Sequence, residues 1–370
     1  MVNTNKIAII GGGKMASNIV EYLIQFDVSI LWYIRSASVL QEKKNKIAKK
    51  ISRLLKAGND DQELESRKHE VVTFTDSFRY VRDADIIIEC VSESIESKRD
   101  VFNELQGTNA IVFSNTSSLP LGSFIPEKMR GQSAGLHFFY PVQLKQFVEL
   151  NILKETELPV LETMRSFVGS IDKRALELPE EHHFVLNRIF LSWLAQSSCA
   201  VQKYTISFDR FDREIVKSLF PLGPFTFMKN VGFDIMNKSV EMYCQKSKSP
   251  GFFAHLNQLL ENAKVQGDWV VDGIPATDDN EQVMAAAFEV QSVFVNAVYH
   301  ELAAQYVDDQ LLIEALADYA GVSREAINQL LHDITPSLLE TLRRLYNATY
   351  WDVYRPSMKL LRNIKKPDQR

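Results

Sequence analysis

A glycine-rich run near the start of the chain has the residue types and spacing of a phosphate-binding turn. Gly11-Gly12-Gly13-Lys14-Met15-Ala16 fits the pattern GxGxx(G/A). In that pattern the first glycine permits a tight turn and the second lets a pyrophosphate approach the backbone. An apolar run precedes it and a helical pattern follows, so free N–H groups at the helix start would face the phosphates. The run predicts a dinucleotide site formed by Gly11, Gly12, Gly13, Lys14 and Met15.

The end of the second predicted strand bears on which dinucleotide is bound. An acidic residue at this point holds the ribose hydroxyls of NAD, but this chain has Tyr33-Ile34-Arg35-Ser36 there. A guanidinium followed by a hydroxyl suits the 2′-phosphate of NADP. Arg35 is either a cofactor ligand or an ordinary surface arginine, so NAD and NADP both stay open as the cofactor.

Five further segments occur in an order that points to one family. They are ADIIIECVSESIESKRDVF (84–102), SNTSSLPL (114–121), GLHFFYPVQLKQFVEL (135–150), FVLNRIF (184–190) and FPLGPFTFMKNVGFDI (220–235). Together they resemble the L-3-hydroxyacyl-CoA dehydrogenase family, which includes 3-hydroxybutyryl-CoA dehydrogenases. The resemblance implies an oxidoreductase of fatty acid metabolism that reversibly oxidises a 3-hydroxyacyl thioester to its 3-oxoacyl form with NAD or NADP.

The resemblance also assigns catalytic roles. The family's general base corresponds to His137, the carboxylate that orients it to Glu149, and the family's serine and asparagine to Ser117 and Asn187. Histidine titrates near working pH, so it can take the hydroxyl proton while a hydride leaves for the nicotinamide. A carboxylate behind it fixes the tautomer. Ser117 and Asn187 would donate hydrogen bonds to the reacting oxygen or to the thioester carbonyl.

Other residues of the same segments are assigned to the cofactor, and some depart from the family pattern. Family contacts with the nicotinamide end correspond to Glu93 and Lys98. The family's HFFNP reads HFFYP, which places Tyr140 near the nicotinamide or the thioester. The family's Pro-Gly before the VNR helix is replaced by His182-His183, which are either surface residues or extra proton carriers. These changes suggest an unusual acyl group or a different substrate handle.

Alternating strand and helix patterns in the first half must position these groups. Strand-like runs occur at 6–10, 28–34, 71–74, 85–91 and 110–113, with helical patterns between them. Such alternation predicts a parallel sheet with helices on both faces. We therefore expect an α/β Rossmann-type dinucleotide-binding domain at 1–178.

After Leu178-Pro179 the pattern becomes helical to the end of the chain. Helices are expected at 184–204, 209–220, 223–244, 253–264, 281–306, 309–320 and 335–348. We assign 179–370 to an all-α substrate and dimerisation domain. FVLNRIFLSWLAQ and FVNAVYHELAAQ each place an asparagine near the start of an apolar helix. They are either two ordinary helical hairpins or two repeats, 179–265 and 281–370. The protein is then expected to be a homodimer or, with a real repeat, a pseudo-dimeric monomer.

The composition of the chain argues against several other classes of protein. The chain has 370 residues, 45% of them hydrophobic, and a net charge of 42 − 47 = −5. These values argue against disorder and against a general nucleic-acid binder. Three widely spaced cysteines without a CxxC pair predict neither a disulfide framework nor a metal site. A chain without a leader pattern or a membrane-spanning run is expected to be cytoplasmic.

The basic segment 43–56 does not decide whether the acyl chain of the substrate is carried by CoA or by an acyl carrier protein. It is a solvated face, a contact for the phosphates of an acyl-CoA, or a docking surface for an acidic acyl carrier protein. Two rival functions stay open as well. One is a dehydrogenase of a carrier-bound or free hydroxy acid in specialised metabolism, and the other is a nucleotide-binding structural protein without turnover.

Overall fold

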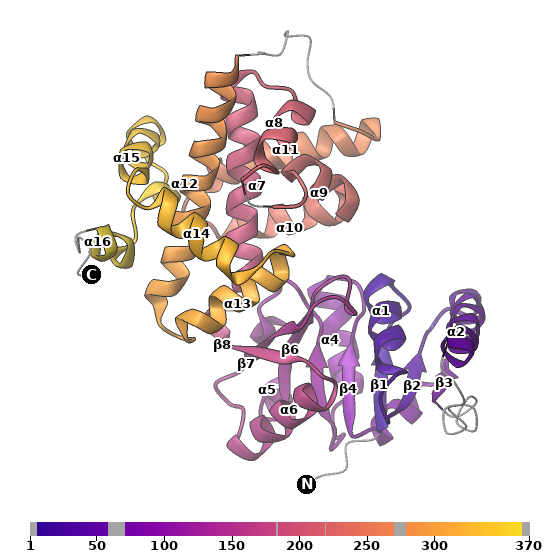
Figure 1. Ribbon diagram of the computed structural model, residues 1–370. Coiled ribbons are helices and arrows are strands. Elements are labelled where there is room, and N and C mark those ends of the chain that lie inside the picture. Colours follow the sequence, from indigo (N-terminus) through magenta and orange to yellow (C-terminus); the bar gives the residue numbers. More distant parts are fainter. Residues whose placement is uncertain (1–5, 58–70, 183, 219, 270–278, 365–370) are drawn as a thin grey trace. The chain divides into compact units, whose positions relative to one another are not determined.

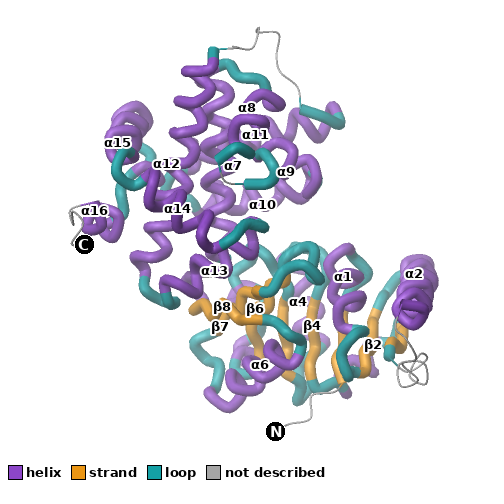
Figure 2. Tube along the Cα trace, in the orientation of Figure 1, coloured by secondary structure: helices purple, strands orange, loops and turns teal. Residues whose placement is uncertain are grey.

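The chain folds into two compact units, Met1–Phe184 and Val185–Arg370. The computed structural model describes residues 6–57, 71–182, 184–218, 220–269 and 279–364. Within those ranges all strands belong to the first unit, while the second unit is helical (Figures 1 and 2). An α/β dinucleotide-binding fold followed by an all-α part is thus confirmed.

An eight-stranded sheet forms the centre of the first unit, with strand order β3-β2-β1-β4-β5-β6-β7-β8. The strands are β1 Lys6–Ile10, β2 Ser29–Tyr33, β3 Val72–Thr75, β4 Ile86–Glu89, β5 Ile111–Ser114, β6 Ser133–Phe138, β7 Phe147–Ile152 and β8 Arg174–Pro179. Strands β1 to β6 pair in parallel, but β6 and β7 are antiparallel. The five strands that the sequence predicts all pair in parallel, as expected. The antiparallel pairing involves β6 and β7, which were not predicted and are joined by a short loop.

Apolar strands and helices bury the core of the first unit. The helices are α1 Lys14–Leu23, α2 Ala37–Ala57, α4 Ile95–Glu104, α5 Glu127–Arg130 and α6 Leu158–Ser170, with 3-10 turns at Phe78–Asp83, Leu121–Ser123 and Glu180–His182. Ile7, Ile9, Ile86 and Ile88 are fully buried. Strands covered on both faces read as continuous apolar runs, which is why the sequence predicts these elements well.

The second unit is built from helices, and several differ from their predicted ranges. They are α7 Val185–Tyr204, α8 Phe208–Ile215, α9 Pro224–Val231, α10 Phe233–Lys246, α11 Pro250–Gln266, α12 Asn280–Ala304, α13 Asp309–Ala320, α14 Arg324–Ile334, α15 Leu338–Thr349 and α16 Met358–Ile364, with a 3-10 turn at Asp352–Tyr354. The helix predicted at 223–244 is two helices, because Gly232 adopts a φ of 106° that glycine alone adopts readily. Helices α14 and α16 were not predicted.

Two runs of helices in the second unit pack in corresponding ways. Helix α7 contacts α9 and α11, as α12 contacts α14 and α16, and α8 contacts α9 as α13 contacts α14. The asparagine correspondence within the predicted repeat is wrong, however. Asn296 lies far from the first turn of α12, which begins at Asn280. Its side chain is fully buried and donates to the carbonyls of Val353 and Arg355. It therefore ties α12 to the segment before α16.

Candidate functional site

The glycine turn has the geometry of a dinucleotide-binding turn. Gly11 has a φ of +124°, and a Cβ there would lie 2.5 Å from the carbonyl oxygen of Cys90. Its own carbonyl accepts from the Trp32 indole N–H at 2.6 Å. At Gly13, the N-cap of α1, a Cβ would meet no described atom within 4 Å, and no side chain caps the helix. The first-turn N–H groups are therefore free of a side-chain cap and can donate to an anionic group such as a phosphate.

Lys14 and Tyr140 meet beside this turn. The Lys14 ammonium lies 4.0 Å from the centroid of the Tyr140 ring, and Tyr140 is 50% exposed. Lys14 thus brings a positive charge to the helix start where phosphates would bind. Met15 is half-buried against the apolar core, so its part in the cofactor site stays a prediction.

Arg35 lies just after β2, at the turn into α2. It is exposed, and two hydroxyls lie close by in the chain, with Ser36 Oγ and Ser38 Oγ 3.0 Å apart. In helix α2 the described lysines Lys43 and Lys46 pair with Glu42 and Glu21. The side chains of residues 53–56, which belong to the predicted basic segment, lie outside the described residues.

A buried lysine between two glutamates lies at the carboxyl end of β4. The Lys98 ammonium is fully buried, 3.0 Å from both carboxylate oxygens of Glu89 and 3.4 Å from Glu93. Burial lowers the pKa of Lys98, but Glu89 and Glu93 raise it more, so the pKa lies above its ordinary value. Lys98 therefore acts as a fixed positive charge that holds Glu93 in place.

Glu93 in turn organises the segment after β5. Its carboxylate accepts from the Thr116 and Ser118 hydroxyls, both at 2.7 Å, and from the Ser117 N–H at 2.9 Å. Burial raises the pKa of Glu93, yet Lys98 and these donors outweigh burial and hold the pKa below its ordinary value. An ionised Glu93 thus positions Ser117, the predicted catalytic serine.

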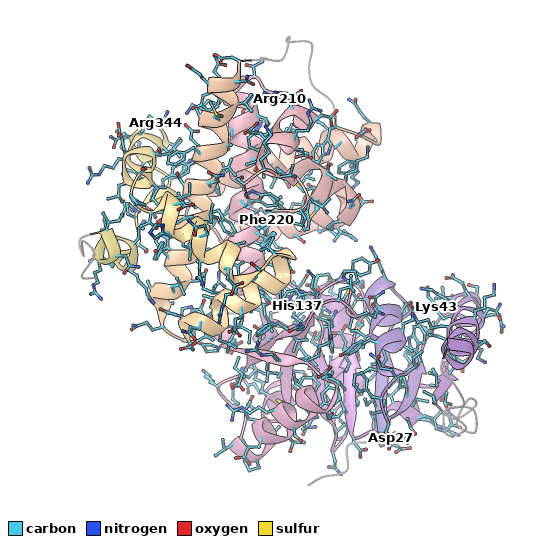
Figure 3. The ribbon with its side chains drawn as sticks, in the orientation of Figure 1. Asp27, Lys43, His137, Arg210, Phe220 and Arg344 are labelled. Atoms are coloured by element: carbon cyan, nitrogen blue, oxygen red, sulfur yellow. The ribbon has the colours of Figure 1, made fainter. Side chains whose placement is uncertain are left out.

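His137 and Glu149 form a buried pair across β6 and β7. The antiparallel register places them directly opposite each other, and His137 Nδ1 lies 2.9 Å from Glu149 Oε2. Glu149 is fully buried and His137 is 7% exposed; Figure 3 marks His137 at one edge of the first unit. Burial of a carboxylate in contact with an imidazole is the arrangement that fixes a catalytic tautomer.

Neighbouring groups lock the imidazole and its strand. The rings of Phe139 and Phe184 pack edge-on to His137, with centroids 4.7 and 5.7 Å away. Asn115 Oδ1 accepts from the Phe138 N–H at 2.9 Å. The serine-bearing segment and the histidine-bearing strand are therefore joined by a direct hydrogen bond.

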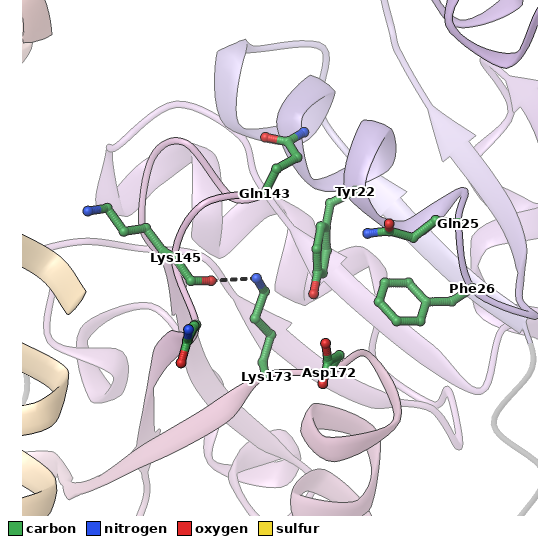
Figure 4. Close-up of a pocket in the computed structure, with 8 residues that line it drawn as sticks. Tyr22, Gln25, Phe26, Gln143, Lys145, Asp172 and Lys173 are labelled. Atoms are coloured by element: carbon green, nitrogen blue, oxygen red, sulfur yellow. Dashed lines mark hydrogen bonds between the residues drawn. The ribbon is translucent and has the colours of Figure 1, made fainter. Parts of the chain in front are cut away.

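The loop between β6 and β7 is anchored by a lysine in a cavity of about 360 Å³ beside the end of α1. The Lys173 ammonium donates to the carbonyls of Val142 at 2.8 Å and Lys145 at 2.5 Å and lies 3.9 Å from the Tyr22 ring centroid. Figure 4 shows Lys173 reaching across this cavity. The lysine therefore fixes the loop that carries Tyr140 and joins β6 to β7.

Asn187 belongs to the second unit, in the first turn of α7. Its Oδ1 accepts from the Tyr319 hydroxyl at 3.1 Å. His182 lies in the 3-10 turn before α7, and His183 lies outside the described residues. The structure thus brings together His137 with Glu149, and Glu93 with Lys98 and Ser117, within the first unit.

Sequence reasoning missed Glu89, Asn115 and Thr116. Glu89 is fully buried, and it also accepts from the Ser114 hydroxyl at 2.6 Å. A lone carboxylate at the end of the apolar run DIIIEC was the available signal. Within the described residues, no cluster of three metal-ligating side chains occurs, and every helix is too short or too polar to cross a bilayer.

Comparisons with known proteins place this chain in a family. Residues 6–181 match the family described as "3-hydroxyacyl-CoA dehydrogenase, NAD binding domain", and residues 184–268 match "3-hydroxyacyl-CoA dehydrogenase, C-terminal domain". A 3-hydroxybutyryl-CoA dehydrogenase of Mycobacterium tuberculosis is 25% identical over 254 residues, covering 67% of this chain and 89% of the relative. Human mitochondrial hydroxyacyl-coenzyme A dehydrogenase is 27% identical, covering 62% of this chain and 76% of the relative.

A solved structure shares the whole fold. The crystal structure of a 3-hydroxybutyryl-CoA dehydrogenase from Escherichia coli superposes with a TM-score of 0.77 at 16% identity, over 98% of both chains. That likeness extends through the helices after residue 268, beyond the two matched domains. With both of its domains matched in order, the chain belongs to the 3-hydroxyacyl-CoA dehydrogenase family.

Proposed function

We propose that this protein interconverts a 3-hydroxyacyl-CoA and its 3-oxoacyl form, with His137 as the general base and acid. Family membership supports an NAD-dependent dehydrogenase of this kind. The observation that carries the assignment of roles is the buried contact of 2.9 Å between His137 Nδ1 and Glu149 Oε2. That contact occupies Nδ1 and leaves Nε2 as the ring nitrogen that can exchange a proton with the substrate.

The chemistry of the pair follows from its geometry. With Nδ1–H donating to Glu149, the neutral imidazole carries its lone pair on Nε2. In the oxidative direction Nε2 takes the proton of the 3-hydroxyl as the C3–H bond breaks, and Glu149 stabilises the imidazolium that forms. A bound nicotinamide dinucleotide would supply the acceptor for the hydride. In the reductive direction the imidazolium returns the proton to the oxygen formed from the ketone.

Ser117 and Asn187 complete the proposed machinery. Glu93 holds the Ser117 backbone through its N–H at 2.9 Å. The Ser117 hydroxyl, which lies 3.3 Å from the same carboxylate, would turn from it to donate to the reacting oxygen. Asn187 is included because the family pattern assigns its position to the substrate. Its amide N–H₂ would donate to the ketone or thioester carbonyl and so increase the polarity of the carbon that exchanges hydride.

The cofactor is a nicotinamide dinucleotide, and the family favours NAD. For this chain we propose that Arg35, with the hydroxyls of Ser36 and Ser38, also accepts the 2′-phosphate of NADP. Exposed positive charge without a strand-end carboxylate supports this. Measured dissociation constants for NADH and NADPH test it: Arg35→Ala should weaken NADPH binding about tenfold and leave NADH unchanged. Equal effects on both cofactors would contradict the phosphate role.

Turnover tests the proposed function itself. Nicotinamide absorbance is followed with acetoacetyl-CoA and longer 3-oxoacyl-CoA substrates, using NADH and NADPH in parallel. Oxidation of either cofactor that depends on the thioester supports the proposal. Cofactor binding without hydride transfer to any thioester would contradict it and favour a structural protein. The same substrate on an acyl carrier protein decides between the two handles.

A further inference from the structure

The amide of Asn187 is held by a residue from the far end of the chain. Tyr319, in α13, donates its hydroxyl to Asn187 Oδ1 at 3.1 Å. The Tyr319 ring is itself fixed, because it packs edge-on against Phe190 with centroids 4.5 Å apart. An amide is planar, so fixing its oxygen also fixes the direction of its N–H₂ group.

The next residue of α7 is held from the same region. Arg188 makes a two-pronged contact with Glu301, with N–O distances of 2.9 and 2.8 Å, and the Tyr306 hydroxyl also donates to Glu301. Two-pronged guanidinium–carboxylate contacts give strong geometric definition. Glu301, Tyr306 and Tyr319 all lie after residue 268, outside the two matched family domains. Helices α12 and α13 and the turn between them therefore fix the first turn of α7.

We infer that Tyr319 is a positioning residue for the reaction, acting through Asn187. The inference rests on the proposed function, in which the Asn187 N–H₂ group meets the substrate carbonyl. The Tyr319 hydroxyl donates to the amide oxygen of Asn187. The N–H₂ group of Asn187 is therefore directed away from Tyr319. Loss of the hydroxyl removes a contact that favours this orientation of the amide over the one rotated by 180°. In the rotated orientation the amide oxygen would face a substrate carbonyl and repel it.

Tyr319→Phe tests this with little structural change, because the ring that packs on Phe190 remains. We expect kcat to fall about tenfold, the effect of one hydrogen bond on the barrier. The KM for the acyl-CoA and the dissociation constant for the cofactor should change less than about twofold, since the amide acts on the reacting carbonyl. The matched control is Tyr346→Phe, in the same helical half, whose hydroxyl accepts from Arg355; it should leave kcat unchanged.

A double-mutant cycle with Asn187→Ala separates positioning from a structural effect. If Tyr319 acts through Asn187, then Tyr319→Phe has no further effect on kcat in the Asn187→Ala background. An equal loss in both backgrounds, or no loss in either, overturns the inference.

Failure of the proposed function is seen separately. Asn187→Ala with full kcat, or a wild-type protein without turnover, contradicts the proposed function. In that case the side-chain amide resonance of Asn187 still tests the contact. Tyr319→Phe should shift this resonance and Tyr346→Phe should not, and an unshifted resonance would overturn the inference.

Discussion

Lys98 is a fully buried charged residue, so its stability depends on the two carboxylates that it contacts. Its ammonium is fully buried between Glu89 and Glu93. Removing one member of a buried ion pair leaves uncompensated charge and costs about 3–5 kcal/mol. Lys98→Met should therefore lower the unfolding temperature by about 10 °C, measured by calorimetry.

The control for this prediction is an exposed lysine. Lys46 contacts Glu21 at 2.6 Å, but its side chain is 54% exposed. Exposed pairs contribute about 0–1 kcal/mol, so Lys46→Met should shift the unfolding temperature by about 2 °C or less. Similar shifts for both variants would show that the buried network does not stabilise the first unit.

Glu93 gives this network a pH dependence of known sign. Its pKa is held below the ordinary value, so the ionised carboxylate favours the folded state. This contribution is complete above the ordinary glutamate pKa of about 4.3 and is lost as pH falls through the lowered pKa. The difference in unfolding temperature between wild type and Glu93→Gln should be constant above about pH 5 and shrink on acidification. A difference that grows on acidification would contradict the account.

At the scale of elements, two glycines of the same turn are expected to have different roles: Gly11 is needed for folding, and Gly13 is needed for cofactor binding. Gly11→Ala would place a Cβ 2.5 Å from the backbone of Cys90 at a φ of +124°, whereas a Cβ at Gly13 meets open space. Gly11→Ala should therefore destabilise the first unit by about 2 kcal/mol or more. Gly13→Ala should leave the unfolding temperature unchanged but weaken NADH binding at least tenfold, because the pyrophosphate needs that space. Calorimetry and fluorescence titration check the two halves, and loss of stability in Gly13→Ala would refute the contrast.

The sequence predicted the apolar strands β1 to β5 and missed β6 and β7, which carry His137 and Glu149. Strand β6 (SAGLHF) and strand β7 (FVELNI) are buried along nearly their whole length. Each nevertheless carries a titratable group, His137 in β6 and Glu149 in β7, so the run does not read as a buried apolar strand. His137 and Glu149 satisfy each other only once the register is formed, so no local pattern reveals the pairing. The family resemblance predicted which two residues form the pair, and only the antiparallel register of β6 and β7 shows that they are in contact.

At the scale of the whole molecule, the second unit consists of two runs of helices, α7 to α11 and α12 to α16, that contact each other. Helices α7 and α12 lie against each other within one chain, and Arg188, Asn187 and Tyr319 join the two runs of helices. We propose that the second run takes the place of a partner subunit. Light scattering should therefore give the monomer mass of 42.3 kDa. A stable dimer at low micromolar concentration would contradict this.

The central claim is that His137, held by Glu149, exchanges the proton that accompanies hydride transfer. The most direct measurement is the single-turnover rate of hydride transfer from bound NADH to acetoacetyl-CoA in His137→Asn. The account predicts a rate about 10²–10⁴-fold below wild type, with an unchanged dissociation constant for NADH. A rate within threefold of wild type would show that another group carries the proton.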